Sequence, residues 1–158
     1  MAKGAGGTPG RTPTINNRRA RFNYHVLDTY EAGIMLAGSE VKSLRESRAS
    51  LQDAYARVSD GEAWIHGLHI APYVFARDDL DPIRPRKLLL HRREIEELQR
   101  ATMEKGMTLV PLRLYFKDDR VKVEVAVARG KRSYDKRHAI AERDAQRDVD
   151  RALKGQRD

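Results

Sequence analysis

Apolar and polar residues alternate along two neighbouring stretches of the chain, residues 107–116 and 121–128. A period of two is typical of a β-strand that buries one face. Lys122 and Glu124 fall on the polar face of the second stretch, and residues 117–120 have the length of a hairpin loop. The pattern therefore predicts two antiparallel strands. Their predicted inward positions are Val110, Leu112, Leu114 and Phe116 in the first strand, and Val121, Val123, Val125 and Val127 in the second.

Shorter patterns of the same kind occur earlier in the chain. Residues 53–58 and 62–70 flank a turn-favouring segment at 59–61, which predicts a second hairpin. Residues 21–28 and 33–38 predict a further pair of strands. Together with the first hairpin, these patterns indicate about six short strands, each with one polar face.

Two helices are predicted between the strands. Residues 91–105 follow a proline-containing segment and place Ile95, Leu98 and Thr102 on one stripe, and a shorter helix is predicted at 40–46. Antiparallel strands with helices at their connections favour a small closed barrel. The predicted fold class is mainly β with small helices, an OB-like antiparallel barrel of about six strands.

The positive charge of the chain lies at its two ends. The chain has 158 residues and a net charge of +8. The first 21 residues hold five Lys/Arg and no acidic residue, and the last thirty hold ten Lys/Arg and six Asp/Glu. Residues 22–128 are nearly neutral, with 16 basic and 17 acidic residues. Cationic arms on a neutral body are typical of a protein that binds RNA or the ribosome.

Composition also restricts where the protein works and how it is divided. The chain has no cysteine, so disulfides and thiolate metal sites are excluded. We find neither a signal-peptide pattern nor an apolar run of transmembrane length, so we expect a cytoplasmic protein without a membrane partner. We expect a disordered basic arm at 1–15, the barrel at 16–129 and a basic C-terminal tail at 130–158.

The tail has the pattern of an amphipathic helix. At 100° per residue, its basic stripe spans about 80° and faces a thin apolar side. The stripe is Arg143, Arg147, Arg151 and Lys154, and the apolar side is Ala141, Ala145, Val149, Ala152 and Leu153. Such a helix is marginal alone in water, because nucleation is costly and the apolar side is thin. We therefore predict a tail that becomes helical on binding a polyanion.

Patterns of catalytic and metal chemistry are not found. His66 and His69 are three residues apart on a predicted strand and point to opposite faces, so they do not share one ion. The sequence contains no phosphate-binding glycine loop and no nucleophile elbow. We expect a protein that is not an enzyme and has no metal and no cofactor.

Residue types suited to RNA binding gather at two places. Residues 16–24 combine amides, arginines and the aromatic residues Phe22 and Tyr24. Arginine forks onto phosphate and Tyr24 offers a stacking plane. Phe22 is better interpreted as a core residue, whereas Tyr24 fits either role. Residues 82–87 form a basic loop that two prolines stiffen.

The chain resembles a known family in several stretches. These are NNRRARFNY (16–24), YEAGIMLAGSEVKSLRES (30–47), LQDAYARV (51–58), RPRKLLLHRREIEEL (84–98), TLVPLRLYF (108–116) and VKVEVAVARGKRSYDKR (121–137), followed by the charged tail. On these motifs it is similar to the SsrA-binding proteins, also called small protein B, which are the bacterial partners of transfer-messenger RNA. The resemblance implies an OB-like barrel with a C-terminal tail.

The resemblance implies a role in trans-translation. The protein would bind the tRNA-like domain of transfer-messenger RNA, support its alanylation and deliver it to the A site of stalled ribosomes. The tail would occupy the empty mRNA channel near the small-subunit decoding centre. Alanyl-tRNA synthetase and elongation factor Tu would be partners indirectly, through the RNA, and the protein would be a monomer.

The same motifs imply two sets of contact residues. Those for the RNA are Asn17, Arg19, Tyr24, Glu31, Lys42, Arg45, Arg86, Lys87, Leu89 and Lys122. Those for the decoding centre and mRNA channel are Gly130, Lys131, Arg132, Tyr134, Asp135, Lys136 and Arg137, with Arg143, Arg147 and Arg151 of the basic stripe. Glu31 either accepts a hydrogen bond from RNA or pairs with a cation of the body. Many relatives have His at the position of Tyr134. Both rings can stack on a base, but tyrosine cannot become cationic, so stacking or hydrogen bonding is expected there rather than a change of protonation.

Two other functional classes fit parts of the pattern. A general OB-fold protein that binds single-stranded RNA or associates with the ribosome would use the tail only as a cationic anchor. A hydrolase acting on RNA is the third class. Preference for a tRNA-like fold over single strands separates the first two classes, and turnover identifies the third.

Overall fold

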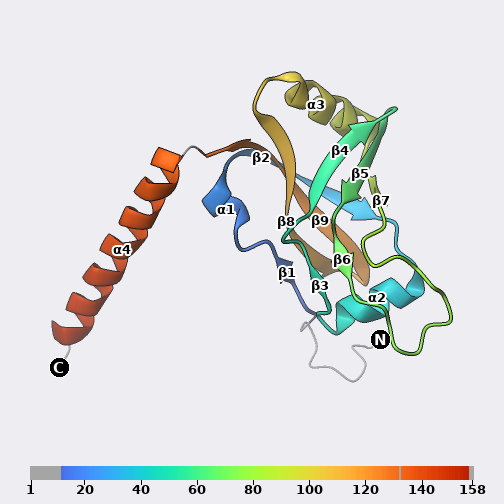
Figure 1. Ribbon diagram of the computed structural model, residues 1–158, viewed down its shortest axis with the longest axis horizontal. Helices are drawn as coiled ribbons and strands as arrows, with labels where there is room; N and C mark the ends of the chain where they lie inside the picture. Colours follow the sequence, from blue (N-terminus) through green and yellow to red (C-terminus); the bar gives the residue numbers. More distant parts are fainter. Residues whose placement is uncertain (1–11, 132, 157–158) are drawn as a thin grey trace.

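The computed structural model describes residues 12–131 and 133–156, and within the last helix it describes the side chains at 140–141 and 143–152. The elements in chain order are β1 (Ile15–Asn16), α1 (Ala20–Asn23), β2 (Tyr24–Ile34), α2 (Gly38–Arg45), β3 (Ala49–Ser50), β4 (Tyr55–Ser59), β5 (Glu62–His66), β6 (His69–Ile70), β7 (Arg86–Leu89), α3 (Arg92–Met103), β8 (Met107–Lys117), β9 (Arg120–Gly130) and α4 (Ser133–Gln156). Figure 1 shows the strands gathered into one body, from which α4 projects.

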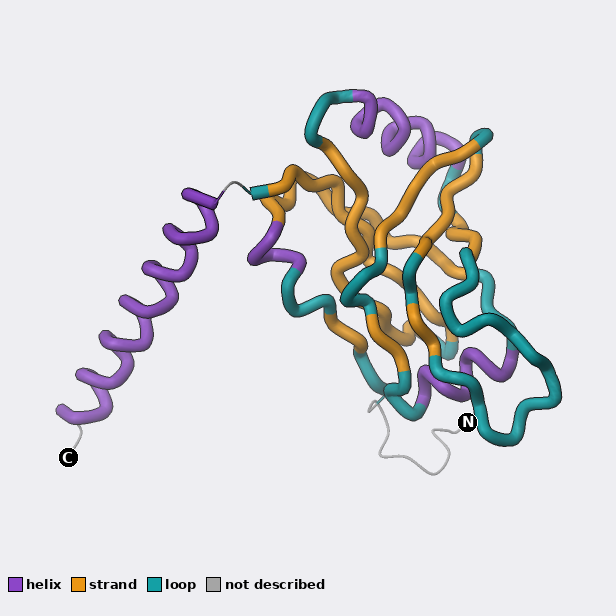
Figure 2. The backbone as a smooth tube through the Cα atoms, viewed as in Figure 1, coloured by secondary structure: helices purple, strands orange, loops and turns teal. Residues whose placement is uncertain are grey.

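Within the described residues, six strands form a closed antiparallel ring. Their order is β8–β4–β5–β7–β2–β9, and β9 pairs back onto β8. Strand β1 is added alongside β8, and β3 and β6 form a separate two-stranded sheet. Figure 2 shows the helices outside this ring of strands. The predicted fold class, an OB-like barrel with small helices, is confirmed.

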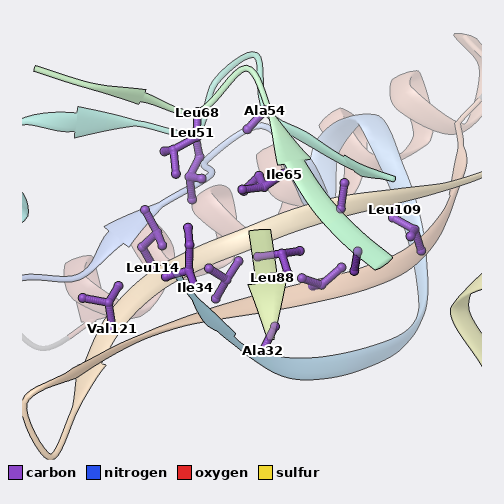
Figure 3. Close-up of a cluster of buried hydrophobic side chains, with 14 of the residues drawn as sticks. Ala32, Ile34, Leu51, Ala54, Ile65, Leu68, Leu88, Leu109, Leu114 and Val121 are labelled. Atoms are coloured by element: carbon purple, nitrogen blue, oxygen red, sulfur yellow. The ribbon is translucent and has the colours of Figure 1, made fainter. Parts of the chain in front are cut away.

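The interior of the ring is filled by aliphatic side chains from every strand of the ring. Val123 and Val125 are fully buried in this core, and Val121 and Val127 join them, as the alternation in the sequence predicts. Figure 3 shows Ala32, Ile34, Leu88 and Leu114 from the strands around the ring pointing into the same cluster. On the outer side of β9, Lys122 and Glu124 remain partly exposed, whereas Ala126 and Ala128 are buried in a second apolar cluster.

A bulge in β8 corrects the predicted faces of that strand. The register with β9 shifts between Pro111 and Arg113. Leu109 and Leu114 pack into the barrel core, whereas Val110 and Leu112 pack into a second cluster on the other side of the sheet. One extra residue in a strand reverses the facing of every side chain beyond it. The prediction that 110, 112, 114 and 116 share one face was therefore wrong.

The first predicted strand pair is a single long strand. Residues 24–34 form β2 and pair along their length with β9, including Thr29 with Ala126 and Glu31 with Glu124. Residues 20–23 form the short helix α1, and α2 already begins at Gly38. Thr29 and Glu31 are exposed on the outer side of the sheet, whereas Tyr30 between them packs against the core. The sequence alone does not distinguish such exposed strand positions from a turn.

The other predicted strands and helices of the barrel are present with shifted boundaries. The strand predicted at 62–70 is divided into β5 and β6 at Gly67, whose φ is 74° and where a Cβ would overlap the Asp53 carbonyl oxygen, so that no side chain fits. Helix α3 covers the predicted stripe, and its Leu98 is buried against the core. Residues 133–156 form helix α4, and the dependence of this helix on binding a polyanion stays a prediction.

No helix within residues 12–131 and 133–156 is both long enough and apolar enough to cross a bilayer. Of the arm predicted at 1–15, residues 1–11 lie outside the described residues. The last residue of the arm, Ile15, pairs with Leu114 of β8.

Candidate nucleic-acid interface

Three of the predicted RNA-contacting residues lie on the outer surface of the β7–β2–β9 sheet. Ala32 and Val123 point into the core, so their neighbours Glu31 and Lys122 point outward. Leu89 pairs with Gly33 across β7 and β2, and Gly33 pairs with Lys122 across β2 and β9. The fold therefore brings together positions 31, 89 and 122, which are distant in the sequence.

The outer surface of the sheet has a groove at Gly33, which pairs with Leu89 on one neighbouring strand and with Lys122 on the other. Gly33 has no side chain, and a Cβ built there would lie 3.3 Å from the Cβ of Leu89. Leu89 and Lys122 flank this position from the two neighbouring strands, roughly 10 Å apart at the usual strand spacing. Leu89 is 49% exposed, so its role is not that of a core residue. The groove is lined by Gly33, Ile34, Leu36, Val41, Leu89, Asp119, Arg120, Val121 and Lys122.

Glu31 pairs with residues of the body and remains exposed to solvent. Its carboxylate accepts hydrogen bonds from the Tyr115 hydroxyl and, at 3.2 Å, from the Lys117 ammonium. The Tyr115 hydrogen bond, followed by that of Lys117, holds the pKa of Glu31 below its ordinary value. Burial and the hydrogen bond to Glu31 raise the pKa of Tyr115 to about 12. Glu31 is thus a fixed, ionised acceptor on this surface, with lone pairs left for a ligand donor.

Three residues beside Glu31 were not predicted from the sequence. Arg113, Tyr115 and Lys117 alternate along the outer face of β8, and Tyr115 is the register partner of Lys122. The Arg113 guanidinium stacks 4.3 Å from the centroid of the Tyr115 ring and also binds Glu124 at 3.1 Å. The signal in the sequence that identifies this face is the alternation of a cation, an aromatic residue and a cation at every second position.

Helix α2 adds two cations at the end of the groove. Lys42 and Arg45 are exposed and lie three residues apart, so they share one side of the helix. The Arg45 guanidinium lies 4.8 Å from the centroid of Phe116 and 3.8 Å from Asp119. The Lys42 ammonium lies 5.4 Å from the centroid of Tyr73. Val41 of the same helix lines the groove, so both cations are continuous with it.

Arg86 is an interior residue, which corrects the prediction that it contacts RNA. Its side chain has no exposed surface and binds Glu40 at 2.7 Å and the carbonyl oxygen of Leu68 at 2.6 Å. Arg84, the neighbouring cation of the predicted basic loop, also binds Glu40, at 2.6 Å. Residues 86–89 are strand β7 rather than loop. Arg86 therefore acts as a structural residue beneath the surface.

Lys87 points outward on β7, because Arg86 and Leu88 on either side are buried. Its ammonium lies 2.5 Å from the carboxylate of Glu62 on β5. Both side chains are partly exposed, so a phosphate can take the place of the Glu62 carboxylate beside Lys87.

A second group of predicted residues lies at the opposite end of β9. Tyr24 pairs with Gly130, eight positions from Lys122 on the same strand, which corresponds to roughly 26 Å. Tyr24 is half-buried against the second apolar cluster, so part of its ring packs in the core and part faces solvent. Asn17 is held by a hydrogen bond from its side chain to the Pro111 carbonyl at 2.9 Å, and Arg19 is exposed just before α1.

The predicted ribosome-contacting residues begin where β9 ends. Gly130 pairs with Tyr24, and the amide of Lys131 donates to the carbonyl of Asn23 at 2.8 Å. Arg132 lies outside the described residues, and Tyr134, Asp135, Lys136 and Arg137 lie in α4 with side chains outside the description.

The described part of the basic stripe is exposed along α4. Arg143, Arg147 and Arg151 recur every four residues, which places them on one side of the helix. Arg143 lies 5.7 Å from the centroid of the Phe22 ring on α1, and Arg151 binds Asp148 at 3.0 Å.

Among residues 12–131 and 133–156, the structure places no group of three or more His, Cys, Asp or Glu side chains close enough to hold a metal ion. His66 stacks on Tyr55 with ring centroids 5.2 Å apart, and His69 lies on a different strand.

Comparison with known proteins gives one consistent result. The family model described as SmpB protein matches residues 14–155. The chain is similar to the SsrA-binding protein of Thermobifida fusca, with 58% identity over 142 residues, 89% of this chain and 89% of that protein. It is also similar to the SsrA-binding protein of Desulforamulus reducens, with 53% identity over 156 residues, 98% of this chain and 97% of that protein.

The fold is similar to a solved chain described as "tmRNA-SmpB: a journey to the center of the bacterial ribosome". The TM-score is 0.66 and the identity is 46%, and the match covers 81% of this chain and 94% of that chain.

Proposed function

Because the chain belongs to the SmpB protein family, we propose that it is an RNA-binding adaptor of trans-translation. It binds the tRNA-like domain of transfer-messenger RNA and delivers this RNA to the A site of ribosomes stalled on messages without a stop codon. The observation that carries the proposal is the outer face of β7–β2–β9, where Leu89 and Lys122 line the groove over Gly33 and Glu31 lies two positions before Gly33 on β2.

The chemistry of this face suits a folded RNA. Lys122, Lys42 and Arg45 supply cations for phosphates along the groove and its α2 end. Glu31 is ionised and is an acceptor only, so it recognises a 2′-hydroxyl or a base amino group rather than a phosphate. Leu89 offers an apolar contact to a ribose or a base beside these polar groups.

The second group extends the interface along the barrel. Tyr24 lies roughly 26 Å from Lys122 along β9, a separation that a folded RNA element spans more readily than one nucleotide does. Arg19 is exposed just before α1, close in the chain to Tyr24. Asn17 is tied to Pro111 through its amide nitrogen, so its oxygen remains as an acceptor. In this proposal Lys87 exchanges Glu62 for a phosphate when RNA binds.

The tail serves the ribosomal step. With the exposed stripe of Arg143, Arg147 and Arg151, α4 enters the empty mRNA channel, and residues 130–137 reach the decoding centre. The protein acts as a cytoplasmic monomer and is not an enzyme. It supports alanylation of the RNA, and alanyl-tRNA synthetase and elongation factor Tu are reached through that RNA. The barrel at 16–129 and the tail at 130–158 are thus separate functional parts.

The RNA that copurifies with the protein from its own cells tests this function. We expect transfer-messenger RNA to be the dominant species in wild type and to be reduced in the Lys122→Glu variant. A mixture of messages and ribosomal RNA fragments would instead support a general single-strand RNA-binding protein. A competition assay between the tRNA-like domain and an unstructured RNA of equal length distinguishes the two functions in vitro.

A further inference from the structure

The loop between β6 and β7 exposes two large apolar side chains. Val74 is 75% exposed and Phe75 is 81% exposed. Figure 1 shows this loop beside α2, at the end of the barrel remote from α3. Burying a phenylalanine is worth roughly 1.5–3 kcal/mol, so a ring left in water gives no such stabilisation to the free protein.

The position of the loop does not depend on Phe75. Backbone and side-chain hydrogen bonds hold it, including Ser43 Oγ to the Ala71 carbonyl at 2.6 Å and Ser39 Oγ to the Asp78 carboxylate at 2.7 Å. The amide of Ala76 also donates to the carbonyl of Tyr73 at 3.0 Å. Because polar contacts fix the loop, it presents Phe75 in a defined place.

Phe75 is part of an aromatic ledge, which we define as Lys42, Tyr73, Phe75 and Arg77. The rings of Tyr73 and Phe75 meet edge to face, with centroids 5.6 Å apart. The Lys42 ammonium lies 5.4 Å from the Tyr73 centroid, and Arg77 is exposed. The ledge borders a concave surface lined by Gly38, Ser39, Lys42, Tyr73, Phe75, Ala76, Arg77 and Asp78.

The ledge matches the chemistry that recognises an unpaired nucleotide. Single-stranded nucleic acids bind where aromatic side chains offer a stacking plane beside cations that face the backbone. Lys42 and Arg77 supply these cations, and the carboxylate of Asp78 is engaged by Ser39. The ledge is also continuous with the candidate interface, because Lys42 and Arg45 lie on the same side of α2.

We propose that an unpaired base of the bound RNA stacks on Phe75, with Lys42 and Arg77 contacting its flanking phosphates. This inference rests on the proposed RNA-binding function and adds a subsite beyond the groove. Stacking on the Phe75 ring contributes affinity that depends only weakly on salt, whereas the phosphate contacts of Lys42 and Arg77 account for the salt dependence of the subsite.

The test measures binding of a transcript of the tRNA-like domain to full-length variants over a range of salt concentrations. Phe75→Ala is expected to weaken binding about fivefold to a hundredfold, the range of one base–aromatic stack, with little change in the salt slope. Phe75→Tyr is expected to retain binding. Val74→Ala, at the similarly exposed neighbouring position, is the matched control and should bind as wild type does.

A direct readout uses a Phe75→Trp substitution in a chain that also carries Trp64→Phe, since Trp64 is the one tryptophan of the sequence. Stacking of a base should quench the new indole on RNA addition. Unchanged affinity of Phe75→Ala together with no quenching would overturn the inference. Equal losses for Val74→Ala and Phe75→Ala would also overturn it, because they would indicate a non-specific apolar contact.

The same assay separates this inference from the proposed function. If Lys122→Glu weakens binding and Phe75→Ala does not, the groove stands and the ledge is not an RNA subsite. If Phe75→Ala leaves RNA affinity intact but changes the sedimentation of the free protein, a second copy of the chain covers the ledge, and the inference is again wrong.

Discussion

The guanidinium of Arg86 lies 2.7 Å from the carboxylate of Glu40, although 46 positions separate them in the sequence. Arg86 also donates to the carbonyls of Leu68 and Pro82, and Glu40 accepts from the amide of Ala37 at the start of α2. One ion pair therefore joins α2, β7 and the loop between β6 and β7. Because Lys42 and Arg45 lie on α2, this pair also positions the cations of the candidate interface.

Removing the charge of Glu40 is expected to destabilise the protein strongly. Glu40→Gln leaves the buried Arg86 without a counter-charge, and breaking such a pair costs about 3–5 kcal/mol. Urea unfolding monitored by circular dichroism measures this loss. The matched control is Glu62→Gln, which breaks the partly exposed pair with Lys87 and should cost at most about 1 kcal/mol. Equal losses in the two variants would contradict the assignment of Arg86 to the interior.

The same pair predicts a pH dependence of stability. Burial alone would raise the pKa of Glu40, but hydrogen bonds from the two arginines and from the Ala37 amide outweigh it and lower the pKa. A lowered pKa in the folded state gives stability that is present above the unfolded-state pKa of about 4.3 and is lost as the pH falls through the folded-state value.

We therefore expect the stability difference between wild type and Glu40→Gln to be constant near neutral pH and to shrink below about pH 4.3. Urea unfolding of both proteins between pH 7 and pH 3 measures this difference directly. A difference that grows on acidification would show that Glu40 is not ionised in the folded state.

The parts of the fold that follow from local alternation were predicted from the sequence. In β9, every second residue is a valine and no bulge interrupts the pairing with β8 beyond Arg113, so Val123 and Val125 face the core as expected. In β8, the bulge after Pro111 reverses the faces, and the two apolar clusters make both faces apolar. Alternation then carries no information about which side is the barrel core.

The predicted site residues lie at the surface only where a suitable side chain occupies an outward position of a strand or helix. Leu89 is exposed and Lys122 is partly exposed, as an interface requires. Arg86 lies in a motif rich in cations, and its burial depends on Glu40, a partner that no local pattern identifies. Tyr115 was missed because its contact with Glu31 depends on the register of three strands rather than on sequence spacing.

Reversing the charge at Lys122 is expected to weaken RNA binding without unfolding the barrel. The side chain points outward beside Gly33, so Lys122→Glu removes one phosphate contact and places a carboxylate in the groove. The slope of log K against log salt should become shallower by about 0.9 if the phosphate that Lys122 neutralises belongs to a duplex. Filter binding of the tRNA-like domain at several salt concentrations gives both the affinity and the slope.

The charge-matched control is Lys105→Glu, in the exposed turn between α3 and β8. It changes the net charge by the same amount away from the groove, so its affinity should stay close to wild type. Equal weakening by Lys105→Glu and Lys122→Glu would mean that net charge, and not the groove, determines RNA binding.

The last prediction separates two roles of the tail. If the tail is only a cationic anchor, its charge is sufficient. If it must be helical in the mRNA channel, the backbone of α4 matters as well. Ala145→Pro leaves every charge in place, removes a backbone hydrogen bond in the interior of α4 and costs about 3 kcal/mol of helix stability there. We expect this variant to bind free transfer-messenger RNA as wild type does and to lose peptide tagging on stalled ribosomes.

The matched control is Ala145→Gln, a helix-compatible change at the same exposed position, which should keep both activities. RNA binding and tagging measured side by side decide the matter, because full tagging by the proline variant would leave only the anchor role.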